Sequence, residues 1–516
     1  MFATLCLFIV LCSWSLLTGR YGGPDEPSHV IRAAAVAGGD LTGRSAPGMD
    51  DGFRLVDVPV ALGSGDPSCY RHDPRVTPGC AVPATTPPTV TVATAAGTYP
   101  PHYYALVGGM ARLFGGAAEP MTYRLAGDVL VAVVLGCIVV RLSRWRSRAA
   151  ASLLLAALPP AAWFLFGVVN PNSLEIALLA LTWVGVAEFA MQEPTGRVSS
   201  STVAAWSFAA AVLVRPVAVL AAPTIAVVVL LSTTPEQRRV GPRGRRLAMV
   251  ASPIAAACAF TGIWQLLLAP ATDDSRTASS IPLAEALAKA VSATNDTVRE
   301  SVGSLGWLEF SAPNVAQIGW WLVVGVAAMA SCTRARFARS FALAAITIVA
   351  IPVAFEVLMY RRVGFVWQGR YSIAAALGAV TVGAIAVADP LTDDHSPRRA
   401  LRHLRVAARL APLVGVAGLL ITQWAAARRY TVGVDGPWSM AGADAWHPRL
   451  DTWLLIAISA CALAGLACWW RLSNAATAGS DDVAEHVDDD VRRTAEVERV
   501  DPAAAAELHV GQIGHG

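Results

Sequence analysis

The chain has 516 residues, of which 55% are hydrophobic and 15% are charged, and its formal net charge is only +3. Its mean hydropathy of +0.50 is far from that of a soluble domain, in which about a quarter of the residues are charged. This composition excludes a soluble globular protein, and we expect no nucleic-acid partner. Repeated apolar runs of roughly 16 to 20 residues predict an all-α, multi-spanning (polytopic) membrane protein instead.

Twelve segments are apolar enough to be drawn as membrane-crossing helices: residues 2–17, 122–141, 149–168, 173–190, 202–214, 217–232, 247–269, 316–331, 340–358, 372–388, 409–426 and 452–470. The first lacks a basic leader and a small-residue cleavage site, so we interpret it as a retained signal anchor. Arginines cluster at 141–148, 238–246, 334–339 and 398–409, and the positive-inside rule assigns all four clusters to the cytoplasm. Both termini are then cytoplasmic, as expected for a multi-pass protein of the plasma membrane.

The first predicted outer region, residues 18–121, opens with Gly-Gly-Pro-Asp-Glu-Pro-Ser-His over residues 22–29. Asp25 and His29 are four residues apart and Glu26 and His29 are three apart, so a helix starting here would place them on neighbouring faces. Acidic groups at a membrane edge need water, a partner or a substrate. The structural alternative is an ordinary helix start, in which Asp25 is the cap and Glu26 lies in the first turn.

Cys69 and Cys80 are the two cysteines well outside the predicted spans. A disulfide is the natural interpretation on an oxidising face, and a metal site that includes His72 is the alternative. Aromatic side chains return at residues 99–104, where most of the rings are typical of interfacial anchors. Tyr103 is also a supporting site candidate.

Two motifs lie at the outer ends of later spans. Arg124 and Asp128 form an i,i+4 pair, which we interpret as structural. Asn172 and Glu175 have the spacing of a capping box. A structural role is therefore favoured for both, and Asn172 is kept as a supporting site candidate.

Residues 201–231 form an apolar stretch that only Arg215 and Pro216 interrupt. Two short helices broken at this point keep every arginine cluster on one side. At ~1.5 Å per residue each half reaches only ~20 Å, which is short of a ~30 Å hydrocarbon core. Such broken helices line cavities. Arg215 then needs an anion, which is either a substrate or a structural partner such as Glu175 or Glu356.

Two later outer segments carry further candidates. The second outer region, residues 271–317, contains Trp307 and Glu309 in its Gly-Trp-Leu-Glu sequence. The loop at 359–371 departs from the positive-inside trend, and guanidinium groups match phosphate oxygens bidentately. Contact with lipid headgroups is the alternative. The candidates in this loop are three arginines, Arg361, Arg362 and Arg370, supported by Gln368 and Tyr371.

Carboxylates on one outer segment and phosphate-suited arginines on another match the demands of glycosyl transfer from a lipid-linked sugar phosphate. One carboxylate would deprotonate the acceptor hydroxyl, and the arginines would hold the leaving phosphate. The catalytic candidates are Asp25, Glu26 and His29, and the phosphate-binding candidates are Arg370, Arg361, Arg362 and Arg215. No cofactor is required, although a divalent cation is left open.

Three motifs carry a resemblance: Pro-Asp-Glu-Pro-Ser-His at 24–29, Gly-Trp-Leu-Glu at 306–309 and Trp-Gln-Gly-Arg-Tyr at 367–371. Over residues 1–470 the chain resembles a bacterial family called domain of unknown function 2142, which is grouped with the GT-C glycosyltransferases. The resemblance implies a GT-C-like bundle of about 12 transmembrane helices with a large first extracytoplasmic loop. It also implies polyprenyl-phosphate sugars as donors, Asp25 as the base, Glu26 as its partner and Arg370 as the phosphate ligand. Glu309 stands where an aspartate is expected.

The expected partners are a polyprenyl-phosphate-linked sugar donor, an envelope glycan or lipid acceptor, and membrane lipids. A flippase for lipid-linked saccharides and a non-catalytic scaffold for envelope assembly are the rival functions. Residues 1–472 are expected to form the transmembrane domain. Residues 473–516 are expected to form a disordered, acidic cytoplasmic tail, because residues 474–516 carry ten acids and three arginines without apolar periodicity.

Overall fold

The computed structural model describes residues 1–49, 52–193, 198–234, 245–268, 281–389, 398–442 and 445–473. Much of the arginine cluster at 238–246, part of the second outer region and the acidic tail lie outside the described residues. Met1–Ala464 forms one compact unit and Gly465–Gly516 a second, of which the structure describes only the end of the last helix. Apart from the end of the helix Thr452–Ser473, the features below belong to the first unit.

The described chain contains eight helices that are long and apolar enough to cross a membrane. A ninth candidate is the pair α6 (Arg148–Leu155) and α7 (Pro160–Phe166), which is bent by 64° at two prolines. Three shorter apolar helices are α1 (Phe2–Leu17), α9 (Ser200–Val214) and the combined η3 and α10 (Pro216–Ser232). The chain is therefore a multi-pass membrane protein, and the number of twelve crossings stays a prediction. The eight long helices are α5 (Pro120–Leu142), α8 (Pro171–Met191), α12 (Arg245–Leu268), α15 (Asn314–Ser331), α16 (Ala335–Val363), η4 (Gly369–Ser372) with α17 (Ile373–Ala388), α18 (Arg398–Val432) and Thr452–Ser473.

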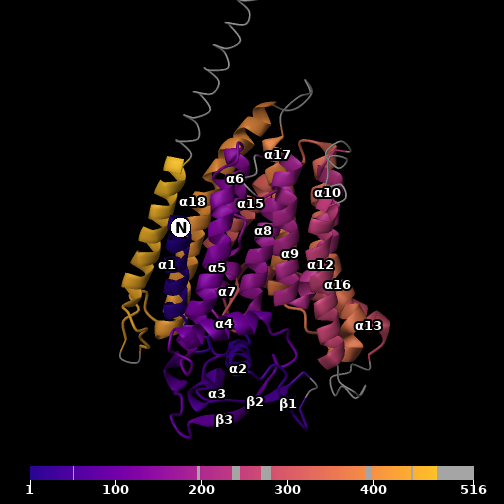
Figure 1. The fold of residues 1–516 in the computed structure, drawn as a ribbon. Helices are drawn as coiled ribbons and strands as arrows, with labels where there is room; N and C mark the ends of the chain where they lie inside the picture. The colour runs from indigo at the N-terminus through magenta and orange to yellow at the C-terminus, as the bar shows by residue number, and fades with distance from the viewer. Residues whose placement is uncertain are drawn as a thin grey trace, which may run out of the picture. The chain divides into compact units, whose positions relative to one another are not determined.

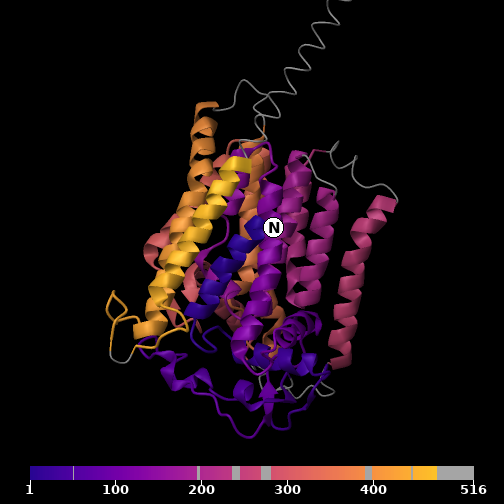
Figure 2. The same cartoon turned by 60° about the vertical axis from the view of Figure 1, so that its left-hand side comes forward.

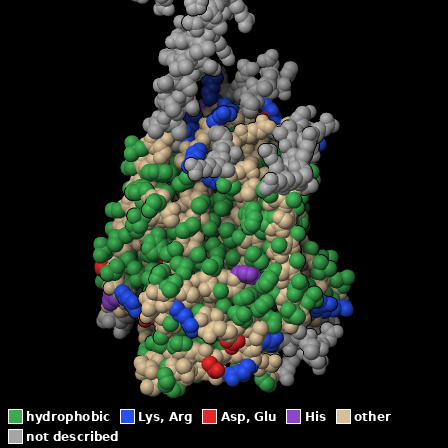
Figure 3. Space-filling model, in the orientation of Figure 1, with side chains coloured by type: hydrophobic (Ala, Val, Ile, Leu, Met, Phe, Trp, Pro, Cys, Tyr) green, Lys and Arg blue, Asp and Glu red, His purple; other side chains and the backbone are tan. Residues whose placement is uncertain are grey.

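Hydrophobic side chains cover the middle of the face drawn in Figure 3, whereas Lys and Arg side chains lie mainly toward its upper and lower ends. This distribution is what a surrounding hydrocarbon layer requires, because a charge at its centre is costly. In Figures 1 and 2 the long helices run side by side through this middle zone.

The helix predicted to break at Arg215 does so. Helix α9 ends at Val214, Arg215 is extended with φ −151° and ψ 118°, and Pro216 begins the 3-10 helix η3. Proline excludes the helical conformation from the residue before it and offers no N–H to the preceding turn. The break therefore follows from the sequence, and it leaves the Arg215 side chain between two short apolar helices.

The chain between α1 and α5 folds into a compact region at one end of the helices (Figure 1). Helix α2 (Glu26–Ala37) packs on strands β2 (Arg54–Pro59) and β3 (Thr89–Thr94) and against α4 (His102–Leu113). The sheet is antiparallel in the order β1-β2-β3, with β1 at Arg44–Ser45 and Val56 opposite Val92. Two short turns, η1 (Pro67–Cys69) and η2 (Pro78–Cys80), are joined by a Cys69–Cys80 disulfide, and α3 covers Val60–Gly63.

A second polar segment precedes α15. It consists of α13 (Leu283–Ser292), α14 (Thr294–Gly303) and a short hairpin of β4 (Ser304–Leu305) and β5 (Phe310–Ser311). Helix α13 packs against α16, and α14 packs against η4. This segment therefore supports the start of η4, where the Trp-Gln-Gly-Arg-Tyr motif lies.

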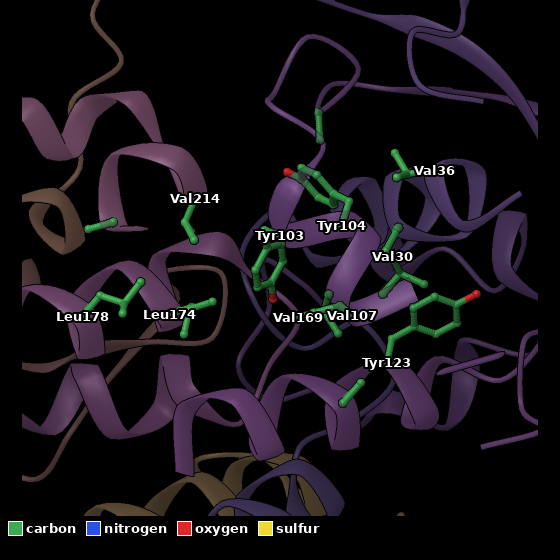
Figure 4. Close-up of a cluster of buried hydrophobic side chains, with 14 of the residues drawn as sticks. Val30, Val36, Tyr103, Tyr104, Val107, Tyr123, Val169, Leu174, Leu178 and Val214 are labelled. Carbon is green, nitrogen blue, oxygen red and sulfur yellow. The ribbon is translucent and has the colours of Figure 1, made fainter. Parts of the chain in front are cut away.

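A buried hydrophobic cluster joins the polar end region to the membrane helices (Figure 4). Most of its members are Ala, Val and Leu, and its largest side chains are aromatic, each of which buries on the order of 150–250 Å². Tyr103 and Tyr104 are fully buried here, so the interpretation of these two rings as interfacial anchors is wrong. The cluster fixes α2 and α4 against α5, α8 and α9 through side chains that include Val30, Val36, Val107, Tyr123, Leu174, Leu178 and Val214.

Candidate active site

Asp25 precedes α2 in a left-handed conformation, with φ 61° and ψ 6°. Its side chain makes no capping hydrogen bond and instead forms an ion pair with Arg370. Asp25 therefore occupies the N-cap position of α2, with Glu26 in the first turn as the structural alternative expected, but its side chain does not cap the helix. A non-glycine residue in this conformation stores local strain, which is typical of functional sites. The Asp25 side chain is 48% exposed, whereas that of Arg370 is only 5% exposed.

Glu26 points the other way. It is fully buried and forms two bonds with Arg124, at 2.7 and 2.8 Å. It also accepts hydrogen bonds from the backbone N–H of Gly23 and Val169. The described bonds of Glu26 are thus with Arg124, Gly23 and Val169 and not with Asp25, and its role as catalytic partner stays a prediction. The expected Arg124–Asp128 pair is also not formed, because Asp128 accepts from the Ser15 hydroxyl at 2.8 Å.

Arg124 donates hydrogen bonds to backbone oxygens at the end of α1. Its guanidinium donates to the backbone oxygens of Ser15, Thr18 and Gly19 at 2.7–2.9 Å, in addition to its two bonds with Glu26. The last carbonyls of a helix otherwise have no partner within the helix. The ion pair therefore fixes the turn that presents Asp25.

The position of Arg370 is set by close packing of η4 on α14. The N–H of Gly369 donates to Glu300 Oε2 at 2.8 Å. A Cβ atom at Gly369 would lie 2.4 Å from the backbone nitrogen of Ser301, so only glycine fits. Arg370 Nη2 contacts Asp25 and donates to the Tyr371 hydroxyl at 3.2 Å. Its Nε and Nη1 are buried without a hydrogen-bond partner among the described residues.

Arg215 lies beside this centre. Its guanidinium stacks on the Tyr371 ring at 4.1 Å, and its Nη1 is 3.3 Å from Glu175. Asn172 donates to Glu175 at 2.9 Å, whereas the cap of α8 is Asn170. The capping-box interpretation is therefore wrong. Of the two structural partners considered for Arg215, Glu175 is the one in contact.

His29 is buried one turn after Asp25. Its Nδ1 lies 2.9 Å from the Tyr104 hydroxyl, and its ring packs against Tyr99 at 5.9 Å. Burial lowers the pKa of His29 to about 3, although the charge of Asp25 opposes the shift. Burial alone would raise the pKa of Asp25, but the charge and hydrogen bond of Arg370, together with other nearby charges, leave that pKa below its usual value. At pH 7 the site therefore contains an ionised Asp25 and a neutral His29.

The remaining candidate residues make no contact with Asp25 among the described residues. Trp307 donates to the backbone oxygen of Tyr21 at 2.9 Å. Arg361 and Arg362 are exposed in the last turn of α16, where Arg361 stacks on Tyr360 at 5.6 Å. Gln368 directly precedes η4, and its Oε1 is buried without a partner among the described residues. Within that part of the chain, no group of three His, Cys, Asp or Glu residues could hold a metal ion.

Glu309 belongs to a second buried ion pair, with Arg429 at 3.2 Å. Arg429 also donates to the backbone oxygens of Tyr70, Asp73 and Val76 at 2.7–3.2 Å. The pair thus fastens the segment closed by the Cys69–Cys80 disulfide to α18. We infer that Glu309 supports the structure rather than the Asp25–Arg370 centre.

Glu309 should make stability depend on pH. Burial raises its pKa from 4.5 to about 7, against the opposing effect of Arg429. The folded protein then holds a proton that the unfolded chain has lost, so stability should fall as pH rises from about 4.5 to 7. The Glu309→Gln variant should lack this component. Unfolding temperatures of detergent-solubilised wild type and variant at pH 5 and pH 8 measure it, and parallel pH profiles would contradict it.

Comparison with known proteins places the chain in a family. No curated protein matches it. Among solved structures it is similar to ArnT from Cupriavidus metallidurans bound to undecaprenyl phosphate, with 13% identity, a TM-score of 0.43, and coverage of 94% of this chain and 79% of that chain. The apo state of ArnT from that organism gives 14% identity, a TM-score of 0.42, and coverage of 90% and 74%. A family model described as predicted membrane protein DUF2142 matches residues 8–378, which include both Asp25 and Arg370. The chain therefore belongs to the DUF2142 family of membrane proteins.

Proposed function

We propose that this protein is a membrane glycosyltransferase that moves a sugar from a polyprenyl-phosphate donor to a cell-envelope glycan or lipid acceptor. The observation that carries the proposal is the burial and incomplete hydrogen bonding of the Arg370 guanidinium. Its guanidinium is 5% exposed, is paired with Asp25 on one side, and has two buried N–H groups without a partner in the described chain. Buried donors of this kind are costly unless a ligand satisfies them. A phosphate oxygen suits them, because guanidinium and phosphate pair bidentately.

In the proposed reaction, Asp25 accepts the proton of the acceptor hydroxyl. The acceptor oxygen forms a bond to the anomeric carbon of the sugar as the bond from that carbon to the phosphate oxygen breaks. The electron pair of the broken bond stays on the phosphate, where Arg370 and Arg215 stabilise the added charge. Neutral His29 adds no charge that would compete with these groups. The extracytoplasmic location of the site is also part of the proposal.

Donor binding would also prepare the base. In the free protein the Arg370 charge holds the pKa of Asp25 low, which makes the carboxylate a weak base. A phosphate that takes over the guanidinium would leave Asp25 without its cation and beside an anion. Both changes raise the pKa of a carboxyl group. The proton affinity of Asp25 would therefore increase when the donor is in place.

A small apolar cleft lies beside the two arginines. It is lined by α8, η3, α16, η4 and the start of α17, with side chains that include Val217, Leu220 and Ile351. Its polar lining includes Glu175 and Tyr371, which contact Arg215 and Arg370 respectively. Its volume of about 20 Å³ is that of a single water molecule, so a prenyl chain would have to widen the cleft to bring its phosphate to the two arginines.

The test is donor binding and sugar release by purified Arg370 variants. Arg370→Ala should weaken binding of a synthetic polyprenyl-phosphate sugar by roughly 10- to 150-fold, which corresponds to a charge-assisted contact of about 1.5–3 kcal/mol. Arg370→Lys should restore only part of the affinity, because an ammonium cannot form the bidentate pair. Arg44→Ala is the control, because this arginine has a 62% exposed side chain and is not a site candidate, and the variant should bind normally.

The same assay separates the rival functions. A flippase would bind the lipid donor without releasing sugar in the presence of any acceptor. A scaffold would show no saturable binding that depends on Arg370. Either result would overturn the proposed glycosyl transfer.

A further inference from the structure

A charged cavity lies at the end of the membrane helices that is opposite to the Asp25–Arg370 centre. It has a volume of about 620 Å³. Element η4–α17 connects the two ends, because Arg370 is near its start and Asp389 follows its last residue. At ~1.5 Å per residue, the 20 residues of Gly369–Ala388 span about 30 Å. The cavity is therefore separate from the Asp25–Arg370 centre.

Five arginines from different parts of the fold line this cavity, together with two carboxylates. Arg146 and Arg148 come from the start of α6 and the turn before it, Arg336 from the first turn of α16, and Arg405 and Arg409 from α18. The carboxylates are Glu193 and Asp389. Formal charge thus leaves an excess of three positive charges around one partly open cavity.

The two carboxylates are already engaged. Glu193 accepts hydrogen bonds from the backbone N–H groups of Arg146 and Ser147, at 2.8 and 3.2 Å. Asp389 forms ion pairs with both Arg334 and Arg336. Arg405 is directed to the end of α17, where it donates to the backbone oxygens of Val387 and Asp389. Arg146 and Arg409 are exposed toward the cavity, so their charges are available to a ligand.

Helix geometry adds to the positive potential. Helix α16 begins at Ala335, so Arg336 lies in its first turn. The amino end of a helix carries a partial positive charge, which makes a cation there unfavourable unless an anion is near. Asp389 supplies one negative charge, but Arg334 shares it. The site therefore has a net demand for an anion beyond what the described chain provides.

The rest of the lining combines four polar side chains, Ser147, Gln192, Ser232 and Thr234, with an apolar part. Met191, Phe337, Ile385 and the alanines at 190 and 388 form this part of the wall. A free inorganic anion gains nothing from such a surface, whereas the glycerol and first acyl carbons of a lipid do. Basic pockets between transmembrane helices are known to hold anionic lipid headgroups. We propose that this cavity is a binding site for the phosphate group of an anionic phospholipid.

The test compares two matched pairs of substitutions. Arg146→Gln with Arg409→Gln removes two charges that line the cavity. Arg144→Gln with Arg402→Gln removes two exposed charges from the same parts of the chain outside the cavity lining. Native mass spectrometry of the detergent-solubilised protein with added phosphatidylglycerol or phosphatidylcholine measures the affinity. The cavity pair should lose phosphatidylglycerol affinity by about tenfold or more, and the control pair should change it less than twofold.

Three results would overturn this assignment. Equal losses in the two double variants would show that the general basic surface, and not the cavity, attracts the lipid. Equal binding of phosphatidylcholine would remove the need for a net anionic headgroup. Saturable binding of inorganic phosphate that the cavity substitutions abolish, without phosphatidylglycerol binding, would identify a free phosphate as the ligand instead of a lipid.

Discussion

Asp25→Asn should lower the rate of sugar release by about 10²- to 10⁴-fold, which is the usual contribution of a general base. Asparagine keeps the size of the side chain and is among the few residues that accept the left-handed conformation seen at Asp25. The loss should therefore come from the chemistry and not from a displaced backbone. Donor binding should be unchanged or tighter, because the substitution removes the carboxylate that competes with phosphate for Arg370. Single-turnover sugar release and equilibrium binding of a polyprenyl-phosphate sugar measure the two effects separately.

Asp57→Asn is the control for this experiment. Asp57 is an aspartate in the same region of the chain, and it forms an exposed pair with Arg44, with side-chain exposures of 62% for Arg44 and 61% for Asp57. Its loss should leave turnover within about twofold, since exposed pairs contribute little. Wild-type turnover in Asp25→Asn would remove Asp25 from the role of base, and a matched loss of donor binding would reassign it to donor recognition.

The apolar segments could be predicted from the sequence because few backbone structures are stable in the hydrocarbon layer of a membrane. A backbone that crosses a membrane must satisfy its own hydrogen bonds, so an apolar run of sufficient length has to be helical. The break at Arg215 was predictable for a similar reason, since Pro216 dictates it locally. The choice of Asp25 and Arg370 rested on residue type and motif. The structure places these two side chains in contact, and their roles stay proposals.

The partners of the buried charges could not be predicted. Glu26 is 98 residues from Arg124, and Glu309 is 120 residues from Arg429. No local periodicity reports such pairs, because they depend on how distant helices pack. The family resemblance instead paired Glu26 with Asp25, and sequence spacing paired Arg124 with Asp128. These residues are neighbours along the chain but point to different surroundings. The arginine-lined cavity was hidden for the same reason, since it uses residues from several helices.

Breaking the Glu26–Arg124 pair should have the largest effect on stability. Both side chains are almost fully buried, at 0% and 3% exposure, so removing one leaves an uncompensated charge that typically costs about 3–5 kcal/mol. Arg124→Met should be the more damaging single change, because it also removes the donors for the backbone oxygens of Ser15, Thr18 and Gly19. Glu26→Gln should retain part of the hydrogen bonding while losing the charge. The unfolding temperature of purified protein in detergent measures these effects.

The double variant tests whether the pair acts as a unit. Glu26→Gln combined with Arg124→Met leaves no buried charge, so it should be less unstable than the sum of the two single changes. Arg44→Met with Asp57→Asn is the matched control for an exposed pair at 3.1 Å, and each of its changes should cost less than about 1 kcal/mol. Because Glu26 directly follows Asp25, folded Glu26→Gln protein should also release sugar more slowly, while its donor affinity changes little. Additive losses in the double variant, with full sugar release by folded Glu26→Gln, would show that the pair neither acts as a unit nor positions Asp25.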